Sequence, residues 1–337
     1  MGRGHINDTF LLAFEEGPRT VLQGINALVF PDAEGLMANM GRVTRHLQAG
    51  LVDEPDAARR ALRLLPTRTG ADFHRDEAGR AWRMVGYIEG SHTVEGPATA
   101  EQAYEAARAL AAFQVQLADL PEPPLEETLP GFHDTRRHLR SLRAAAEADP
   151  LGRAGRAAPE LAFAWDQAAL AGALMGPLEA GLLPRRTVHN DTKLNNVLLD
   201  DATGKGLCVI DLDTVMPGTG LFDFGDLVRS GAGTVPEDHA LPSEAELDLE
   251  RFRALAEGTR SGLGGLQDTE ERSRMAQAPQ VIAFELGLRF LADHLQGDRI
   301  FRTQDPELNL HRARVQFALL RDMQKREGDM QRIVKRA

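Results

Sequence analysis

Residues 189–196 read HNDTKLNN, and residues 209–213 read VIDLD. Each stretch adjoins a short apolar run, so the two are expected to lie at the ends of neighbouring β-strands. Asp191 can accept the proton of an attacking hydroxyl, while Asn196 and Asp211 offer the oxygen ligands that suit Mg2+. Asp and Asn are also common in turns and helix caps, but this combination of residues and spacings is typical of phosphoryl transfer from ATP.

One of the few lysines of the chain lies inside this polar cluster. Only four are present, Lys193, Lys205, Lys325 and Lys335, so arginine carries nearly all of the positive charge. Genomic codon bias accounts for such a composition, yet the absence of a lysine before Lys193 excludes mechanisms that need one in the first half. Lys193 follows Asp191 by two residues, where its ammonium can point at the phosphate being transferred.

The composition of the whole chain is that of a globular protein. Its 337 residues are 42% hydrophobic and 26% charged, which is enough for two domains with separate cores. A formal net charge of -11 argues against general binding to nucleic acid or to an anionic membrane. The single cysteine, Cys208, excludes a disulfide framework and fits a reducing compartment. No apolar stretch approaches the ~20 residues that span a bilayer, and no signal core begins the chain, so we expect a cytoplasmic protein.

The pattern of residues 1–95 predicts a small lobe that combines helix and sheet. Apolar runs at residues 9–14 and 20–25 flank a Gly-Pro turn and predict an antiparallel hairpin. Residues 33–50 carry apolar side chains at helical spacing, and residues 82–88 read as a further strand. Glycine and proline then break the chain, which places the boundary of this lobe between residues 89 and 97.

Residues 96–337 are mainly helical in pattern, with one interruption by β-type runs. Helices are expected over residues 100–117, 132–148, 160–181, 244–258, 279–295 and 308–325. Short strands are expected within the interruption at residues 187–189, 196–199 and 207–212. The polar cluster therefore lies on an island of strands and turns inside a helical lobe.

The motifs of this island resemble the aminoglycoside phosphotransferase and choline kinase superfamily, and more narrowly N-acetylhexosamine 1-kinases. The resemblance rests on residues 189–196, on residues 209–218 and on Asp223-Phe224-Gly225-Asp226 with Arg229. Weaker similarities lie at residues 4–9, 21–23, 129–134 and 284–291. The resemblance implies an α+β, two-lobed fold like that of protein kinases, with a nucleotide-binding lobe at residues 1–95 and a mainly helical catalytic and substrate-binding lobe at residues 96–337.

The resemblance also implies roles for individual residues. Asp191 would be the catalytic base with Lys193 beside it, and Asn196 and Asp211 would bind magnesium. Structural support for the catalytic loop would come from two residues, His189 and Asp223. Substrate contacts would come from Asp213, which touches the second metal or the sugar, and from Arg229 and Arg289, whose guanidinium forks suit hydroxyl and carbonyl acceptors. Surface or interlobe ion pairs remain open as the alternative for both arginines.

On the nucleotide side, the resemblance points to the start of the chain. Gly2 and Gly4 would let backbone N–H groups approach the phosphates, with Asn7 and Thr9 at the exit of the loop. In related proteins a strand precedes this loop, whereas here the chain starts at the loop, so we expect that strand to be absent or the assigned start to be short.

Two further features concern the nucleotide. Gln23 occupies the place of the usual lysine of the third strand and cannot neutralise a phosphate, so Arg19, Arg42 or Arg45, or else Lys193 with Mg2+, would supply the charge. The linker between the lobes falls at Met84, Gly86 and Ile88, whose backbone could bind the edge of adenine; an ordinary strand fits the same residues.

Together these features predict an ATP- and Mg2+-dependent kinase that phosphorylates the anomeric hydroxyl of an N-acetylhexosamine. One alternative is the same chemistry on an amino alcohol or an aminoglycoside, although two Trp and two Tyr leave little for an aromatic cage around a cation. Another is a catalytically silent nucleotide-binding scaffold, which the missing lysine suggests. The expected partners are a sugar and ATP, without nucleic acid or membrane, and the expected state is a monomer or homodimer.

Overall fold

The first lobe is built on a four-stranded antiparallel sheet. The computed structural model describes residues 6–54, 56–301 and 303–337, and it orders the strands β1-β2-β4-β3. Their bounds are Asp8–Leu12 for β1, Thr20–Gly24 for β2, His74–Arg75 for β3 and Ala81–Gly86 for β4. The predicted hairpin is confirmed, because β1 and β2 pair in antiparallel register from Asp8 with Gly24 to Leu12 with Thr20.

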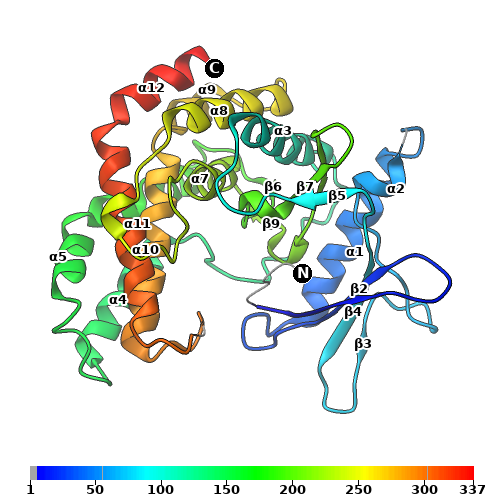
Figure 1. Ribbon diagram of the computed structural model, residues 1–337, viewed down its shortest axis with the longest axis horizontal. Helices are drawn as coiled ribbons and strands as arrows, with labels where there is room; N and C mark the ends of the chain where they lie inside the picture. The colour runs from blue at the N-terminus through cyan, green and yellow to red at the C-terminus, as the bar shows by residue number, and fades with distance from the viewer. Residues whose placement is uncertain (1–5, 55, 302) are drawn as a thin grey trace.

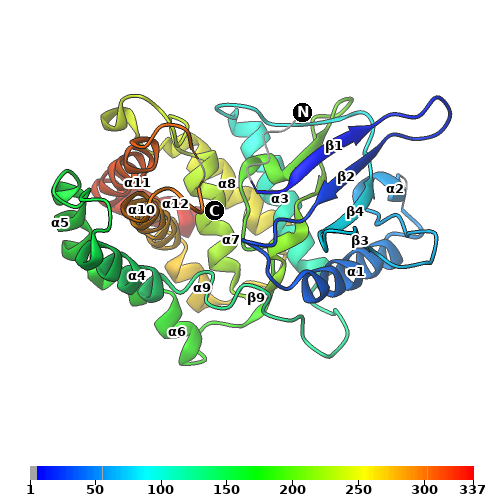
Figure 2. The ribbon, with the colours of Figure 1, turned by 90° about the horizontal axis from the view of Figure 1, so that it is seen from below.

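Helix α1, Ala33–Gly50, packs beside this sheet and has the bounds that the sequence predicts (Figures 1 and 2). Asp32 caps its first turn, since its side chain accepts a hydrogen bond of 2.9 Å from the N–H of Gly35. Leu36, Met40 and Val43 are buried on one face. A short helix, α2 at Ala57–Arg60, follows.

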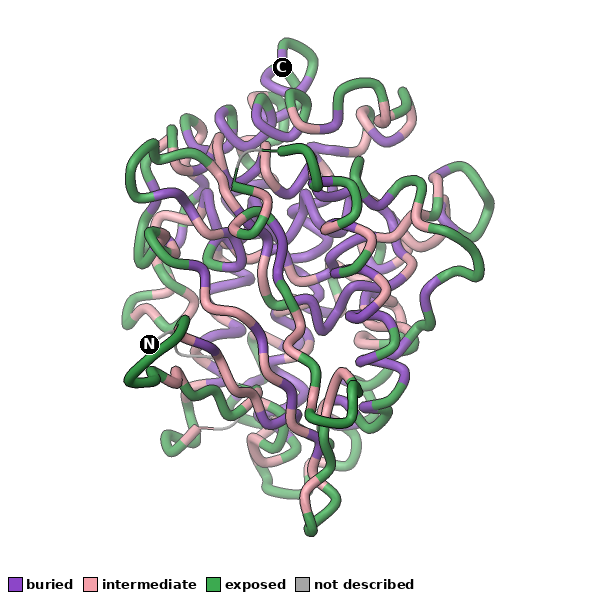
Figure 3. Tube along the Cα trace, turned by 90° about the vertical axis from the view of Figure 1, so that its right-hand side faces the viewer, coloured by how far each residue is buried: buried purple, intermediate pink, exposed green. Residues whose placement is uncertain are grey.

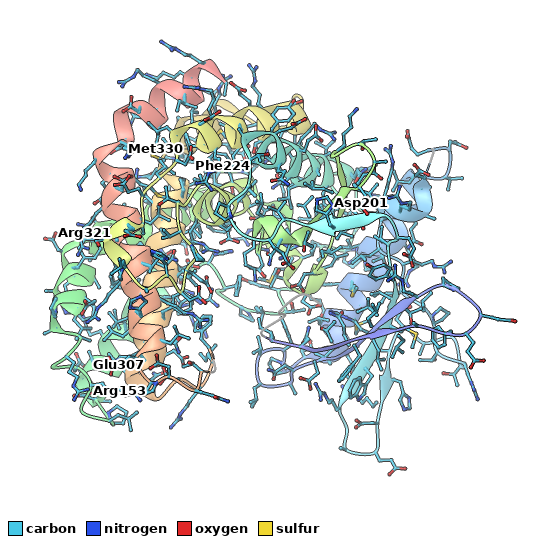
Figure 4. The ribbon with its side chains drawn as sticks, viewed as in Figure 1. Arg153, Asp201, Phe224, Glu307, Arg321 and Met330 are labelled. Atoms are coloured by element: carbon cyan, nitrogen blue, oxygen red, sulfur yellow. The ribbon has the colours of Figure 1, made fainter. Side chains whose placement is uncertain are left out.

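After β4 the chain crosses to the second lobe. Strand β5, Ser91–Thr93, pairs with β7, Val197–Asp200, which in turn pairs with β8, Gly206–Val209. Asp201, labelled in Figure 4 close to β5, donates its N–H to the carbonyl of Gly90 at 2.9 Å. The three strands expected in the island are present, and their bounds differ from the expected ones by a few residues. The first of them, β6 at Arg186–Val188, pairs with a strand that the sequence analysis did not predict, β9 at Met216–Gly218.

The rest of the second lobe is helical. Its helices are α3 Ala100–Gln116, α4 Thr135–Ala148, α5 Ala158–Asp166, α6 Met175–Glu179, α7 Gly220–Gly231, α8 Leu249–Leu263, α9 Thr269–Arg274, α10 Ala278–Gln296, α11 Leu308–Lys325 and α12 Glu327–Arg336. The burial pattern follows these elements, with buried segments running through the interior of the molecule (Figure 3). Phe224, on α7, is buried among the helices of this lobe (Figure 4).

Two helix predictions are wrong in detail. The single helix expected over residues 160–181 is divided into α5, a 3-10 turn at Ala168–Gly172 and α6, in a segment that contains Gly172, Gly176 and Pro177. Helix α8 begins at residue 249 rather than 244, because Asp248 caps the N–H groups of residues 250 and 251. None of the helices in the described part of the chain has both the length and the apolarity that a bilayer crossing needs.

Candidate active site

The loop between β6 and β7 holds Asp191 at the centre of the polar cluster. Nζ of Lys193 lies 3.1 Å from Oδ2 of Asp191, and a quarter of the Asp191 side chain is exposed. The side-chain nitrogen of Asn196 donates to the backbone carbonyl of Asp191 at 2.7 Å, which leaves the side-chain oxygen as the atom that a metal would bind. The predicted trio of Asp191, Lys193 and Asn196 is therefore assembled within one loop.

Asp223 lies beneath this loop and fixes its backbone. Its carboxylate accepts hydrogen bonds from the N–H groups of His189 at 3.0 Å and Asn190 at 2.7 Å, and from the Gln114 side chain at 2.7 Å. Asn190 adopts a φ of 65°, which Asn tolerates better than most residues. The structure thus places Asp223, on α7, in contact with the loop that it was expected to support.

A second loop, which carries Asp211, is joined to the first by hydrogen bonds. Nε2 of His189 lies 2.9 Å from the carbonyl of Ile210, and the N–H of Ile210 donates to the carbonyl of Asn196 at 2.9 Å. The hydroxyl of Thr214 donates to the carbonyl of His189 at 2.7 Å. These bonds bring the two expected magnesium ligands, Asn196 and Asp211, to the same edge of the site.

Burial and neighbouring charges together set the pKa values of the ionisable groups in the site. Burial would raise the pKa of Asp191, but Lys193, His189 and Arg229 together lower it further than burial raises it, so the pKa is below its ordinary value. Asp191 in turn raises the pKa of Lys193. Desolvation, together with the Asp213 and Asp191 carboxylates, raises the pKa of Asp211 to about 6. A divalent cation would relieve this repulsion, so the residues present fit a magnesium site.

Asp213 does not face an open pocket, contrary to the role in metal or sugar contact expected for it. One of its oxygens accepts from Arg83 of β4, and the other accepts from Asn7 at 2.6 Å. Both partners belong to the first lobe, and the Asp213 side chain is 3% exposed. The carboxylate is thus already satisfied by two donors.

Three arginines considered as substitutes for the missing lysine are engaged elsewhere. Their partners are Glu89 for Arg19, Asp72 for Arg45, and backbone carbonyls of residues 121–124 for Arg42. The arginine that does reach the site, Arg83, was missed. Its signal was present in the sequence, since strand alternation places residue 83 on the same buried face as Ala81 and Val85.

The expected nucleotide residues are only partly brought together. Gly2 and Gly4 lie outside the described residues. Thr9 and Gln23 are neighbours across β1 and β2, with Nε2 of Gln23 3.3 Å from the Thr9 hydroxyl.

Some backbone groups of the predicted linker already have partners within the protein. The carbonyl of Met84 accepts from Leu65 and the N–H of Gly86 donates to Arg63, each at 2.9 Å, so internal bonds already use these groups. Ile88 is buried beyond the end of β4, and its carbonyl accepts from the Ser91 hydroxyl at 2.8 Å.

The expected substrate arginines differ in their surroundings. Arg229 is buried and pairs with Asp226 at 2.8 Å, and its charge contributes to lowering the pKa of Asp191. Arg289 instead stacks over the rings of Phe132 at 4.8 Å and Phe301 at 5.5 Å.

Asp226 is a polar residue of the site to which the sequence analysis gave no role. Its Oδ2 is buried without a hydrogen-bond partner, and its charge raises the pKa of Lys193. The repeated acids of the segment DFGD, residues 223–226, were the available signal, because one helical turn separates them on α7.

Comparisons with known proteins identify the family and the fold of the chain. The model of the family described as "Phosphotransferase enzyme family" matches residues 1–266. Similar solved structures include the amicoumacin kinase hAmiN in complex with AMP-PNP, Ca2+ and Ami, at 11% identity and a TM-score of 0.60, covering 93% of this chain and 85% of that one. A microcompartment-associated aminopropanol kinase has 17% identity, a TM-score of 0.59 and coverage of 97% and 96%. Choline kinase from Cryptosporidium parvum has 16% identity, a TM-score of 0.58 and coverage of 99% and 90%. At these identities the structures establish a shared fold.

Proposed function

The chain belongs to the phosphotransferase enzyme family, and from this premise we propose that it transfers the γ-phosphate of ATP to the anomeric hydroxyl of an N-acetylhexosamine. The observation that carries the proposal is the contact of Asp191 with Lys193 on the loop that also holds Asn196. A base, a cation and an oxygen ligand within one loop match what phosphoryl transfer requires.

The proposed chemistry depends on positioning and electrostatics. Asp191 orients the attacking hydroxyl and takes its proton as the oxygen–phosphorus bond forms, while the bond to the leaving ADP breaks. Its lowered pKa keeps the carboxylate ionised at neutral pH. Lys193 offers positive charge to the transferred phosphate. Asn196 and Asp211 would hold Mg2+, which would supply positive charge to the phosphates.

The first lobe, with a boundary proposed near residue 95, would hold the nucleotide. Thr9 and Gln23, which are neighbours across β1 and β2, and Asn7, which precedes β1, would lie on the side of the phosphates. The chain shares its fold with a kinase that was solved with AMP-PNP and Ca2+, and this supports the proposal that a nucleoside triphosphate and a divalent cation are the cofactors.

The acceptor would bind beside Asp226 and Arg229. The unpartnered Oδ2 of Asp226 can accept a hydrogen bond from a sugar hydroxyl, and Arg229 can donate to a hydroxyl or an acetamido carbonyl. Beside the proposed acceptor position, Asp191 with Lys193 and Asp226 with Arg229 form ion pairs, so each of these two carboxylates is balanced by a cation. This balance favours a neutral sugar.

A second candidate acceptor is an amino alcohol. The structural neighbours named as aminopropanol kinase and choline kinase support it, and the carboxylate of Asp211 could pair with an ammonium group. A silent nucleotide-binding scaffold is the remaining alternative.

A panel of acceptors separates these candidates. Release of ADP from Mg-ATP would be measured with N-acetylglucosamine, N-acetylgalactosamine, ethanolamine, choline and an aminoglycoside. Phosphorylation at the anomeric position also removes the reducing end of the sugar, so a reducing-sugar assay identifies the position. ADP release with an amino alcohol alone would favour the second candidate, and stabilisation by Mg-ATP without turnover of any acceptor would favour the scaffold.

A further inference from the structure

A buried arginine of the first lobe, Arg83, contacts a residue of the second lobe. Among the described residues before residue 97, Arg83 is the only buried arginine, and its side chain is 1% exposed. Its Nη1 contacts Oδ1 of Asp213, which lies 130 residues further along the chain. Nη1 also lies 3.2 Å from Sδ of Met40 on α1. The arginine thus passes between the sheet and the helix before it reaches Asp213.

Two further first-lobe side chains secure the same loop. Nδ2 of Asn7 donates to Oδ2 of Asp213 at 2.6 Å, and Oδ1 of Asn7 is held by the N–H of Asn26 at 3.0 Å. Nδ2 of Asn39, on α1, lies 3.4 Å from the carbonyl of Val215. The loop that begins at Asp211 is therefore attached to the first lobe at two points, residues 213 and 215.

We propose that Arg83 is a positioning residue which, through Asp213, fixes the Asp211 loop against the first lobe and thereby aligns the magnesium ligand with the bound nucleotide. This inference rests on the proposed function. Arg83 would then be the functional cation of a first lobe that has no lysine. The cation acts on the metal-bearing loop and does not contact the phosphates.

The surroundings of Arg83 support action through the loop. Its Nε donates to Oε1 of Gln23 at 3.0 Å and its Nη1 contacts Asp213, so two of the three guanidinium nitrogens are directed at protein partners. Asp213 lies two residues after Asp211, whose φ of 61° is in the left-handed region. A non-glycine residue keeps such a conformation only when its surroundings hold it, and the Asp213 contacts hold it from the side of the first lobe.

Paired substitutions test this role without leaving a buried charge alone. Arg83→Met or Asp213→Asn alone leaves an uncompensated charge, and each is expected to lower the melting temperature. The double variant R83M/D213N removes both charges, and its melting temperature should recover most of that loss. R45M/D72N, at the exposed ion pair of the same lobe, is the matched control.

The readouts are the melting temperature, the affinity for Mg-ADP by calorimetry at several Mg2+ concentrations, and the separate kcat and KM values. We expect the double variant to bind Mg-ADP at least tenfold more weakly, to need more Mg2+ and to lose at least tenfold in kcat, with the KM of the acceptor unchanged. Arg83→Lys should retain part of the affinity, because it keeps the charge. The control should match the wild type in every readout.

Three results would overturn the inference. A double variant that regains the melting temperature, the Mg-ADP affinity and kcat would show that the pair contributes packing alone. An increase of the ATP KM in Arg83→Met but not in Asp213→Asn would indicate direct contact between Arg83 and the phosphates. Failure of the wild-type protein to bind Mg-ADP would reject the proposed function together with this inference, whereas the first two results reject the inference alone.

Discussion

Nζ of Lys193 lies 3.1 Å from Oδ2 of Asp191, so the proposed base and the only lysine of the catalytic loop form an ion pair. The pair is partly exposed, with 39% of the Lys193 side chain and 25% of the Asp191 side chain accessible. Each partner stabilises the charged form of the other, which keeps Asp191 able to accept a proton and Lys193 able to stabilise a phosphate.

Asp191→Asn should nearly abolish phosphoryl transfer while the protein stays folded. The amide is close in size to the carboxylate but cannot take the proton of the hydroxyl, so kcat should fall by about 10²–10⁴-fold. Steady-state ADP release and circular dichroism measure the two effects. Full activity in a folded Asp191→Asn variant would exclude Asp191 as the base.

Lys193→Met should damage catalysis far more than replacement of any other lysine. The loss of its positive charge should lower kcat by about 10²–10³-fold, as for other groups that stabilise charge in the transition state. Lys205→Met is the matched control, because Lys205 lies in the exposed turn between β7 and β8. If both variants were equally active, the metal or an arginine would have to neutralise the phosphate.

The contacts of the site could be predicted from the sequence where they join residues that are close along the chain. Contacts between distant segments could not be predicted. Asp191, Asn196 and Asp211 lie on one strand-turn-strand segment, so their spacing was enough to predict that they meet. Arg83 and Asp213 are 130 residues apart and come from different lobes. Their pairing depends on how α1 and the sheet pack against the loop, which no periodicity in the sequence records.

The elements of the fold were likewise predicted best where the local sequence determines them. Helix α1 was predicted to the residue because its buried face and its cap, Asp32, both lie in the local sequence. Helix α7 was not predicted, because ten of the twelve residues of the helix are buried. It therefore lacks the polar face that makes an amphipathic helix recognisable in a sequence. The contacts of Asp213 could not be predicted, because both of its donors are supplied by the other lobe.

A buried ion pair beside the catalytic loop should make stability depend on pH. Nδ1 of His133 lies 2.9 Å from Oε1 of Glu285, and its Nε2 lies 2.9 Å from the carbonyl of Asn190, so both ring nitrogens face acceptors. Burial opposes the charge, but Glu285 outweighs it and raises the pKa of His133; burial likewise opposes the charge of Glu285, yet His133 lowers the pKa of Glu285 to about 2.

The signs of the two shifts define the pH window. The contribution of Glu285 is present above its unfolded pKa of about 4.3 and is lost as the pH falls toward 2. The contribution of His133 is present below about pH 6.5 and is lost as the pH rises through its raised pKa. The melting temperature should therefore fall as the pH rises above about 6.5, and fall less in Glu285→Gln, which lacks the carboxylate that contributes most to raising the pKa of His133. Equal pH dependence in both proteins would exclude this pair as the source.

Gly225→Ala should weaken both stability and activity because α7 has no room for a side chain at this position. A Cβ there would lie 2.7 Å from Cγ1 of Ile282 and 2.8 Å from the carbonyl of Ala278, both on α10. The helices would have to separate, at a cost of about 1–3 kcal/mol, and α7 would carry Asp223 and Asp226 away from the catalytic loop. Gly231→Ala, on the same helix, is the control, since its Cβ would make ordinary contacts of 3.4 Å or more. Urea unfolding and kcat should both change in the first variant, and an unaltered kcat despite lower stability would show that the position of α7 does not control the loop.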